Sequence, residues 1–403
     1  MGRRVFVQGL GLGVVVLVGQ SVQAIDLSWQ PQVRVGMRGT DNVRWAASDK
    51  EAAWGFDTGG GLALNAATST WSSAINPSFN FRRFPIGENL SADEYGVKSQ
   101  HQYKVSERLQ ASVQADYLRD STLSSEVTDA GRRNDVADRD TLSIQPGVSY
   151  LLTDSTSVNA SYGYTDVAFI GAGDQGLVDY KYQQWTLGTT HWFSERLQGY
   201  VSGFITDFEV ADVNSETWTY GGQVGASYAW SDTLSTNMSV GYQTSTIDFL
   251  EQSLVVLVSS EAQASSGGPI ANFSIKKLFD RTKTEFAYAR RVSPSIRGAQ
   301  TLEDDILFTA DHELSKYWAA GFRGGYNMRT AQAQEVVGTS RDLNRDQAAL
   351  GASFTYKATK EISIRTEYRF TRQTLAESSG TIYVNALFVT MSYNGEAHIY
   401  PGY

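Results

Sequence analysis

The chain has 403 residues, no cysteine, 41% hydrophobic residues and a formal net charge of −9. The acidic charge disfavours a nucleic-acid partner, and the absence of cysteine excludes a fold that depends on disulfides. Apolar residues are spread over alternate positions and the mean hydropathy is −0.30, which disfavours a large soluble core built from continuous apolar runs.

The first 24 residues differ in character from the rest. Two arginines precede an apolar stretch from Val5 to Gly19, and Val22 and Ala24 occupy the −3 and −1 positions of a cleavage site. This arrangement predicts a secretory signal peptide over residues 1–24 and a mature chain that starts near Ile25. An N-terminal membrane anchor is the alternative, but the apolar run is short beside the ~20 residues of a spanning helix.

From residue 25 onward, one pattern repeats along the chain. Segments of roughly ten to fifteen residues alternate apolar and polar positions, which is the period of a strand with two different faces. No window shows a sustained helical period. The clearest segments are Trp29–Arg38, Leu109–Tyr117, Ile362–Thr371 and Ala386–Tyr393.

Short and long connections alternate between these segments. Short polar turns occur at residues 65–69, 105–108, 153–156, 193–196, 230–233, 279–282, 314–317 and 358–361, and longer loops at 121–139, 170–177, 249–267, 330–341 and 376–380. Strands are expected to begin near residues 28, 53, 70, 91, 107, 140, 156, 179, 196, 217, 233, 268, 282, 301, 316, 343, 360 and 381. The pattern predicts an all-β fold, a transmembrane antiparallel β-barrel of about 18 strands with short periplasmic turns and long extracellular loops. The barrel is expected over residues 25–394, followed by a short periplasmic C-terminal tail at 395–403.

A soluble β-sandwich would also alternate, but about eighteen two-faced strands cannot share one small core. Aromatic residues also gather beside the short turns, as in the girdle that marks a membrane interface; they are Tyr103, Tyr150, Phe193, Trp230, Phe279, Tyr317, Trp318 and Tyr356. Unpaired strand edges in hydrocarbon would cost several kcal/mol per group, so the sheet must close. We therefore expect a protein of the Gram-negative cell outer membrane, in contact with outer-membrane lipid.

Two further features of the strands give specific expectations. Pro31, Pro77 and Pro146 fall within predicted strands on the outward face, where bulges are expected to accommodate them. The last strand carries Leu387, Val389, Met391 and Tyr393 on its outward face, which resembles the C-terminal signal read by the barrel-assembly machinery, although here ten residues follow it.

A search for catalytic or metal-binding groups indicates neither an enzyme nor a cofactor. His101, His191 and His312 fall on outward positions shortly before a periplasmic turn, and His398 lies in the tail, so no histidine faces a site for hydrolysis. The acidic run at 134–140 could hold calcium, but the neighbouring arginines favour a solvated loop, and no metal ligand is predicted.

The distribution of charge is more informative. Residues 270–375 hold 17 Lys and Arg against 12 Asp and Glu, whereas the rest of the mature chain holds 15 against 31. The predicted lumen-facing residues that would line a substrate path are Arg34, Arg38, Arg82, Lys276, Arg291, Arg323, Arg329, Arg345, Lys357, Arg365, Glu367 and Arg369. Charged walls of a lumen set ion selectivity. The alternative is that inward acids such as Glu285, Asp305, Asp311 and Glu313 pair with them and merely brace the barrel.

The segment Val33–Trp45, in which Thr40-Asp41-Asn42 leaves the first strand, resembles the barrels associated with exopolysaccharide and exosortase systems. The segment Asp140–Asp166 also resembles these barrels. The resemblance implies an export channel for an anionic exopolysaccharide, working with periplasmic polysaccharide-export components. Two alternatives remain: a general diffusion porin, which would differ in having one loop folded inward as a constriction, and a non-conducting structural or adhesive barrel. We also expect the loop Phe249–Gly267 to fold into or over the lumen, because its apolar run at 254–258 would be costly to expose.

Overall fold

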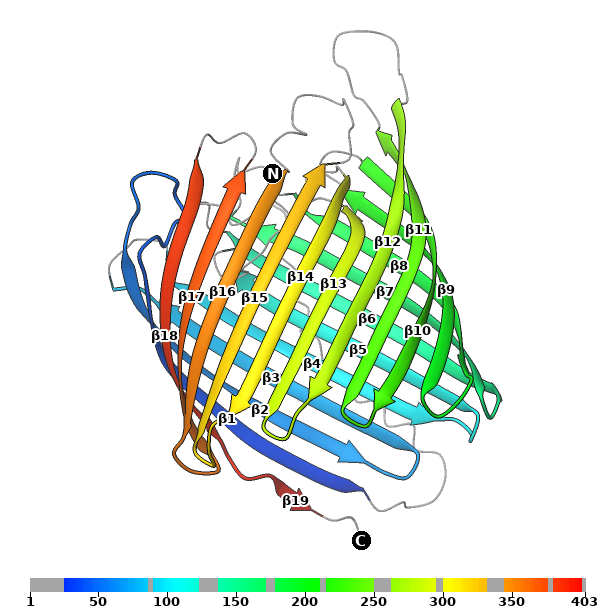
Figure 1. Ribbon diagram of the computed structural model, residues 1–403, viewed down its shortest axis with the longest axis horizontal. Helices are drawn as coiled ribbons and strands as arrows, with labels where there is room; N and C mark the ends of the chain where they lie inside the picture. The colour runs from blue at the N-terminus through cyan, green and yellow to red at the C-terminus, as the bar shows by residue number, and fades with distance from the viewer. Residues whose placement is uncertain are drawn as a thin grey trace, which may run out of the picture.

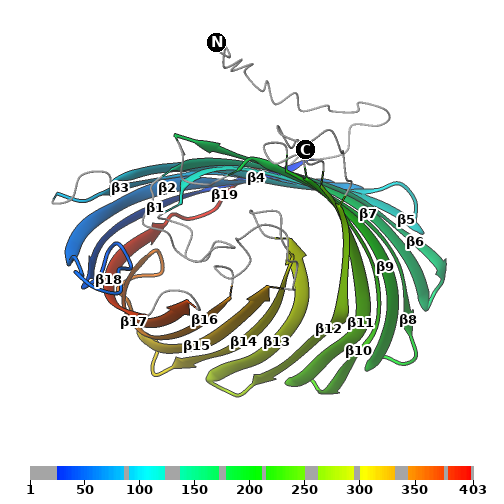
Figure 2. The same ribbon diagram turned by 90° about the horizontal axis from the view of Figure 1, so that it is seen from above.

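The computed structural model describes residues 25–85, 90–122, 137–171, 178–210, 215–249, 262–294, 300–331, 344–375 and 380–400. Within these residues the chain forms a closed antiparallel β-barrel, with its short turns at one end and its longer connections at the other (Figure 1). Figure 2 looks down the barrel and shows the strands arranged as a continuous ring.

The strands follow the chain order around the ring. Their bounds are β1 Asp26–Thr40, β2 Ala53–Ala67, β3 Trp71–Arg83, β4 Ala92–Lys104, β5 Leu109–Ser121, β6 Asp138–Thr153, β7 Thr156–Ile170, β8 Tyr180–Trp192, β9 Leu197–Val210, β10 Ser215–Ser231, β11 Leu234–Phe249, β12 Ala262–Leu278, β13 Thr282–Pro294, β14 Gln300–Glu313, β15 Trp318–Ala331, β16 Arg345–Lys357, β17 Ile362–Leu375, β18 Thr381–Asn394 and β19 His398–Tyr400. Eighteen of these form the barrel wall, and the predicted fold class is confirmed.

The barrel closes where β1 pairs with β18. Nine residue pairs, from Gln32↔Asn394 to Thr40↔Ala386, join the first strand to the last. The chain then continues along β1 in the same direction, and the short strand β19 pairs with the first residues of β1, where Leu27 lies opposite Tyr400. The sequence pattern predicted only a tail at this position, because a three-residue strand is too short to show a period.

The outward face carries a band of exposed apolar side chains. On β1, Val33, Val35 and Met37 are exposed, and the other strands expose large hydrophobic side chains at alternate positions in the same way. The eight aromatic residues predicted to form a girdle beside the turns are all exposed. A closed sheet with a band of exposed apolar side chains satisfies its backbone in lipid, so this face is the membrane-spanning surface. The described residues contain no helix of the length and apolarity that crossing a membrane requires.

The three prolines are accommodated differently from the expected bulges. Beside Pro77 and Pro146 the ladder loses two successive pairs and then resumes without a shift in register. Pro31 lies where β1 changes partner from β19 to β18, and its carbonyl oxygen accepts a hydrogen bond from the Gly395 N–H at 2.8 Å. Proline has no backbone N–H, so each proline removes one hydrogen bond from the ladder. Because the ladder is interrupted locally, no extra residue, and therefore no bulge, is needed.

The connection between β1 and β2, residues 41–52, folds inward rather than outward. Trp45 packs against Ile382 and Val384 on the inner face of β18, and Val43 packs with Ala53 and Leu90. The expectation for the loop Phe249–Gly267 is corrected in part: β12 begins at Ala262, so residues 262–267 belong to a strand, and the apolar run at 254–258 lies outside the described residues. A run of small polar residues, Ala262 to Gly267, lacks the strong alternation that would have marked it as a strand.

Candidate functional site

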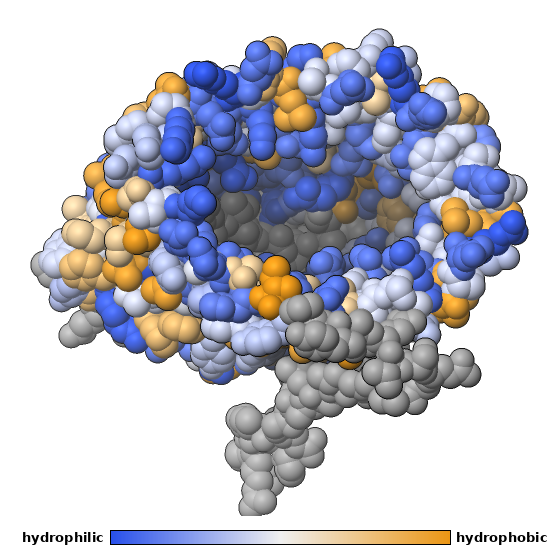
Figure 3. Space-filling model, turned by 90° about the horizontal axis from the view of Figure 1, so that it is seen from below, coloured by the Kyte–Doolittle hydropathy of each residue, from blue (hydrophilic) through white to orange (hydrophobic). Residues whose placement is uncertain are grey.

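The lumen is hydrophilic and hollow. Seen from the turn end, the barrel encloses an open space whose wall is lined by polar residues (Figure 3). The residues that alternate with the exposed apolar ones provide this lining, since successive side chains of a strand point to opposite faces. The lining is of two kinds, a charged wall that runs from β12 through β18 and β1 to β6, and an uncharged wall on β7 to β11.

The charged wall begins with a continuous chain of contacts across β1 to β4. The guanidinium of Arg38 donates to both oxygens of Asp57, at 2.7 and 3.0 Å. Arg82 contacts Asp57 at 3.2 Å and Glu94 at 3.3 Å, and its side chain is only 8% exposed. Arg34 joins the chain indirectly, because it donates to Asn80 at 3.2 Å and Asn80 donates to Glu94 at 3.1 Å.

A second chain of contacts crosses β13 to β16. Arg291 contacts Glu303 at 2.7 Å and Asp305 at 2.8 Å, and Arg329 is paired with the same buried Glu303. These contacts follow from register, since Glu303 lies directly opposite Arg291 on one side and Arg329 on the other. Asn327 links the chain to a further arginine: its amide donates to Asp305 at 2.5 Å and its oxygen accepts from Arg345 at 3.2 Å.

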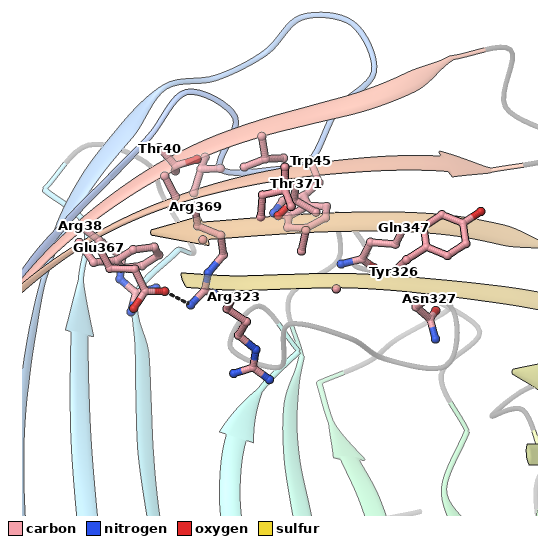
Figure 4. A pocket seen from close by; sticks show the side chains of 18 of the residues that line it. Arg38, Thr40, Trp45, Arg323, Tyr326, Asn327, Gln347, Glu367, Arg369 and Thr371 are labelled. Carbon is pink, nitrogen blue, oxygen red and sulfur yellow. Dashed lines mark hydrogen bonds and ion pairs between the residues drawn. The ribbon is translucent and has the colours of Figure 1, made fainter. Parts of the chain in front are cut away.

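The remaining predicted residues form local pairs, with one exception. Glu367 lies between Arg365 and Arg369, at 3.1 and 2.8 Å, while Lys276 pairs with Glu285 and Lys357 with Glu313. Arg323 is the exception: within the described part of the chain its exposed guanidinium has neither an ion pair nor a hydrogen bond. In Figure 4 it projects from β15 beside the Glu367–Arg369 pair.

The pairing neutralises much of the wall but not all of it. Eight of the eleven basic residues of the predicted set form the ion pairs described above, and together they contact seven carboxylates. An excess of positive charge therefore remains on this side of the lumen, and the exposed Arg323 belongs to it. Such an excess raises the local concentration of anions.

A recess of about 430 Å³ lies in the charged wall beneath the inward-folded loop. The guanidinium groups of Arg38 and Arg369 lie over the ring of Phe388, at 5.4 and 5.2 Å from its centroid. Two cations therefore contact one aromatic ring at the β1–β18 seam. Arg323 and Trp45 also line the recess (Figure 4). The recess therefore brings together the Arg323 guanidinium, the ion-paired Arg38 and Arg369, and the apolar ring of Trp45.

The uncharged wall extends over five adjacent strands. The charged residues of β7 to β11 with described side chains share the outward face of Trp185, Val201 and Val224; they are Asp166, Lys181, Asp207, Glu209 and Glu216. The inward positions are occupied mainly by Ser, Thr, Asn, Gln, Gly, Tyr and Phe, with Val167, Trp192, Val210 and Ala229 among them. This wall was not predicted from the sequence because it carries no charge, although strand parity alone marks its inward positions.

The histidines do not form a catalytic arrangement in the described residues. Each of the three outward-facing histidines near the turns shares one hydrogen bond between its Nδ1 and a hydroxyl on the neighbouring strand. The pairs are His101 with Ser73, His191 with Thr156 and His312 with Thr282. All three pairs lie on the outward face near the turns. No group of three or more metal-binding side chains occurs among the described residues, and residues 134–136 of the acidic run lie outside them.

No protein-family model matches the chain, and no curated protein sequence matches it either. Solved structures share its architecture. OccAB2 of Acinetobacter baumannii is 12% identical, with 93% of this chain and 98% of that one covered, at a TM-score of 0.46. OccK2 (OpdF) of Pseudomonas aeruginosa is 8% identical, with 91% and 98% covered and a TM-score of 0.49. The FrpB iron transporter of Neisseria meningitidis is 7% identical, with 93% and 82% covered and a TM-score of 0.48. At such identities and TM-scores the likeness carries no functional information, so function must be argued from the lumen.

Proposed function

We propose that this barrel is an outer-membrane channel for hydrophilic anionic solutes and that its natural cargo is an anionic exopolysaccharide. The observation that carries the proposal is the exposed guanidinium of Arg323 beside the recess, which has no ion pair or hydrogen bond among the described residues and lies on a wall with excess positive charge. A guanidinium presents a rigid fork of donors that fits a carboxylate or sulfate group. Weak contacts in series allow a polymer to move, whereas one tight site would hold it.

The channel is tested by planar-bilayer recordings on the purified barrel in salt gradients of both directions. We expect steady conductance with an anion preference, and Arg323→Gln should shift the reversal potential toward cations. Lys181→Gln removes the same charge from the outward face of β8 and should leave the reversal potential unchanged. An assembled barrel that does not conduct contradicts the proposal, and so does an Arg323→Gln variant with the original selectivity.

The cargo is tested separately by secretion. Loss of the gene in its native bacterium should abolish release of an anionic exopolysaccharide while synthesis continues, and Arg323→Gln should lower the rate of release. Normal secretion in the deletion strain would remove the polymer from the proposal and leave the channel.

A diffusion porin for small solutes is the second candidate, and one specific observation favours it. Residues 41–52 fold into the lumen and place Trp45 against the inner face of β18, as expected for a constricting loop. Liposome-swelling assays distinguish the two candidates: a porin admits small sugars and amino acids at rates set by their size, and its loss lowers nutrient uptake without affecting polymer release.

A further inference from the structure

The uncharged wall carries aromatic rings that lie against the barrel surface. Tyr200 and Phe204 are four residues apart on β9 and alternate with the outward-facing Val201 and Ile205, so both point into the lumen. At about 3.4 Å per residue their backbones are separated by roughly 13 Å along the strand. Both rings are half-buried, which means that part of each remains accessible from the lumen.

Glycines on the adjacent strand set the orientation of these rings. Phe204 lies directly opposite Gly221 of β10, and Tyr200 directly opposite Gly225. A Cβ atom at Gly221 would come within 2.2 Å of the Phe204 ring, and one at Gly225 within 2.4 Å of the Tyr200 ring. Each ring therefore lies over the backbone of β10, a position that only glycine leaves open.

Hydroxyl and amide groups surround the Tyr200 ring. A recess of about 440 Å³ extends from Tyr200 on β9 across the neighbouring strands as far as Gln102 on β4, and Ser202, Thr190 and Asn159 are among the residues that line it. The Tyr200 hydroxyl also donates to Asn237 of β11 at 3.3 Å. Uncharged donors and acceptors around accessible aromatic rings form a surface suited to a ligand rich in hydroxyls with an apolar ring face.

We infer that the inner face of β8 to β10 is a saccharide-binding wall, on which Tyr200 and Phe204 stack against two separate, non-adjacent pyranose rings of a passing chain. The C–H bonds on one face of a pyranose are weakly positive and pack on the negative face of an aromatic ring. The sugar hydroxyls exchange hydrogen bonds with the serines, threonines and amides of the neighbouring recess. The inference rests on the proposed function and deepens it, because it assigns neutral sugar rings to this wall and anionic groups to the charged wall.

The test uses the purified full-length mature barrel and a neutral linear hexasaccharide of glucose. The hexasaccharide should block the ionic current reversibly, and isothermal titration calorimetry in detergent should report its binding independently of conduction. Combined Tyr200→Ala and Phe204→Ala substitutions should raise the half-blocking and half-saturating concentrations at least tenfold, with open-channel conductance unchanged or slightly higher. Phe204→Trp keeps an aromatic face and should retain binding. Polyethylene glycol of similar size is the control for blockage by bulk alone and should affect both proteins equally.

The outcomes separate the inference from the proposed function. A conducting barrel that neither binds nor is blocked by the hexasaccharide overturns the saccharide wall and leaves the channel. Equal affinity in the wild type and the double variant does the same. A barrel that does not conduct, but whose calorimetric binding is lost in the double variant, contradicts the channel and supports the wall.

Discussion

Asp41 and Asn385 join the two ends of the barrel wall through three hydrogen bonds. The Asp41 N–H donates to the Asn385 carbonyl at 3.1 Å, and its carboxylate accepts from the Asn385 N–H at 2.8 Å and from the Asn385 amide at 2.6 Å. Asp41 follows the last paired residue of β1, so these bonds extend the β1–β18 seam into the inward-folded loop. The Thr-Asp-Asn sequence noted for its resemblance is thus the anchor of that loop.

The next residue completes the anchor. Asn42 is fully buried, and its side chain donates to the Ala46 carbonyl at 2.7 Å and accepts from the Ala46 N–H at 2.9 Å. These bonds close a tight turn around Trp45, whose φ of 55° is in the left-handed region that few side chains adopt. The packing of Trp45 on Ile382 and Val384 offsets the cost of that backbone conformation.

The first prediction is that Asp41→Ala loosens the loop without unfolding the barrel. Removal of the carboxylate leaves two Asn385 donors without an acceptor, each worth about 1 kcal/mol when lost. Single-channel recordings should show larger open-state current noise and a higher mean conductance. Ser48→Ala, an exposed change in the same loop, is the matched control and should behave as the wild type. Identical noise in Asp41→Ala and Ser48→Ala would mean that the loop does not limit the current.

The second prediction concerns the buried carboxylate of the charged wall. Glu303 is 1% exposed and contacts both Arg291 and Arg329, so Glu303→Gln removes a buried carboxylate that two arginines share. Breaking a buried ion pair from one side costs about 3–5 kcal/mol. Unfolding of the purified barrel in urea, followed by a heat-modifiability gel, should reveal this loss. Asp311→Asn, an exposed carboxylate of the same strand, should have little effect.

Strand positions and faces could be predicted from the sequence because they depend on local alternation. The expected strand starts lie within a few residues of the observed ones, and β12 differs most because small residues at 262–267 do not alternate clearly. The parity of Arg38, Glu303 and Arg323 follows from the same alternation. What could not be predicted is which acid each arginine contacts, since a pair such as Glu303 with Arg329 depends on register between strands.

The inward-folded loop could not be predicted for a related reason. Its contacts join Asn42 to the Tyr383 carbonyl and Trp45 to Ile382, residues more than 330 positions apart that meet only because the barrel closes. Apolar content alone pointed to residues 254–258, whereas the observed loop contributes only Val43 and Trp45. Burial of two side chains by a distant strand leaves no periodic signal in the sequence.

The third prediction is that β19 protects the first strand. Residues 395–400 cover the turn end of β1 through the Gly395–Pro31 hydrogen bond and a stacked pair of rings, Trp29 and His398, whose centroids are 4.3 Å apart. A chain ending at Asn394 should assemble but unfold at a lower temperature, because the start of β1 becomes an open edge. His398→Ala removes only the ring contact and should have a smaller effect. Equal stability of the truncated and full chains would show that β19 contributes nothing to closure.

The last prediction separates transport from bracing at a single residue. Glu367 contacts Arg365 and Arg369, whose side chains are 53% and 30% exposed, so its replacement by Gln removes the negative charge that lies between these two guanidinium groups in the lumen. Because this network is partly exposed, the loss of stability should be small, within about 1 kcal/mol. Removal of one negative charge with every arginine retained should raise the anion preference, opposite in sign to Arg323→Gln. The reversal potential in a salt gradient measures this shift, and a heat-modifiability gel checks assembly. A lowered melting temperature with an unchanged reversal potential would assign Arg365 and Arg369 to bracing and leave Arg323 as the principal charge facing the ion path.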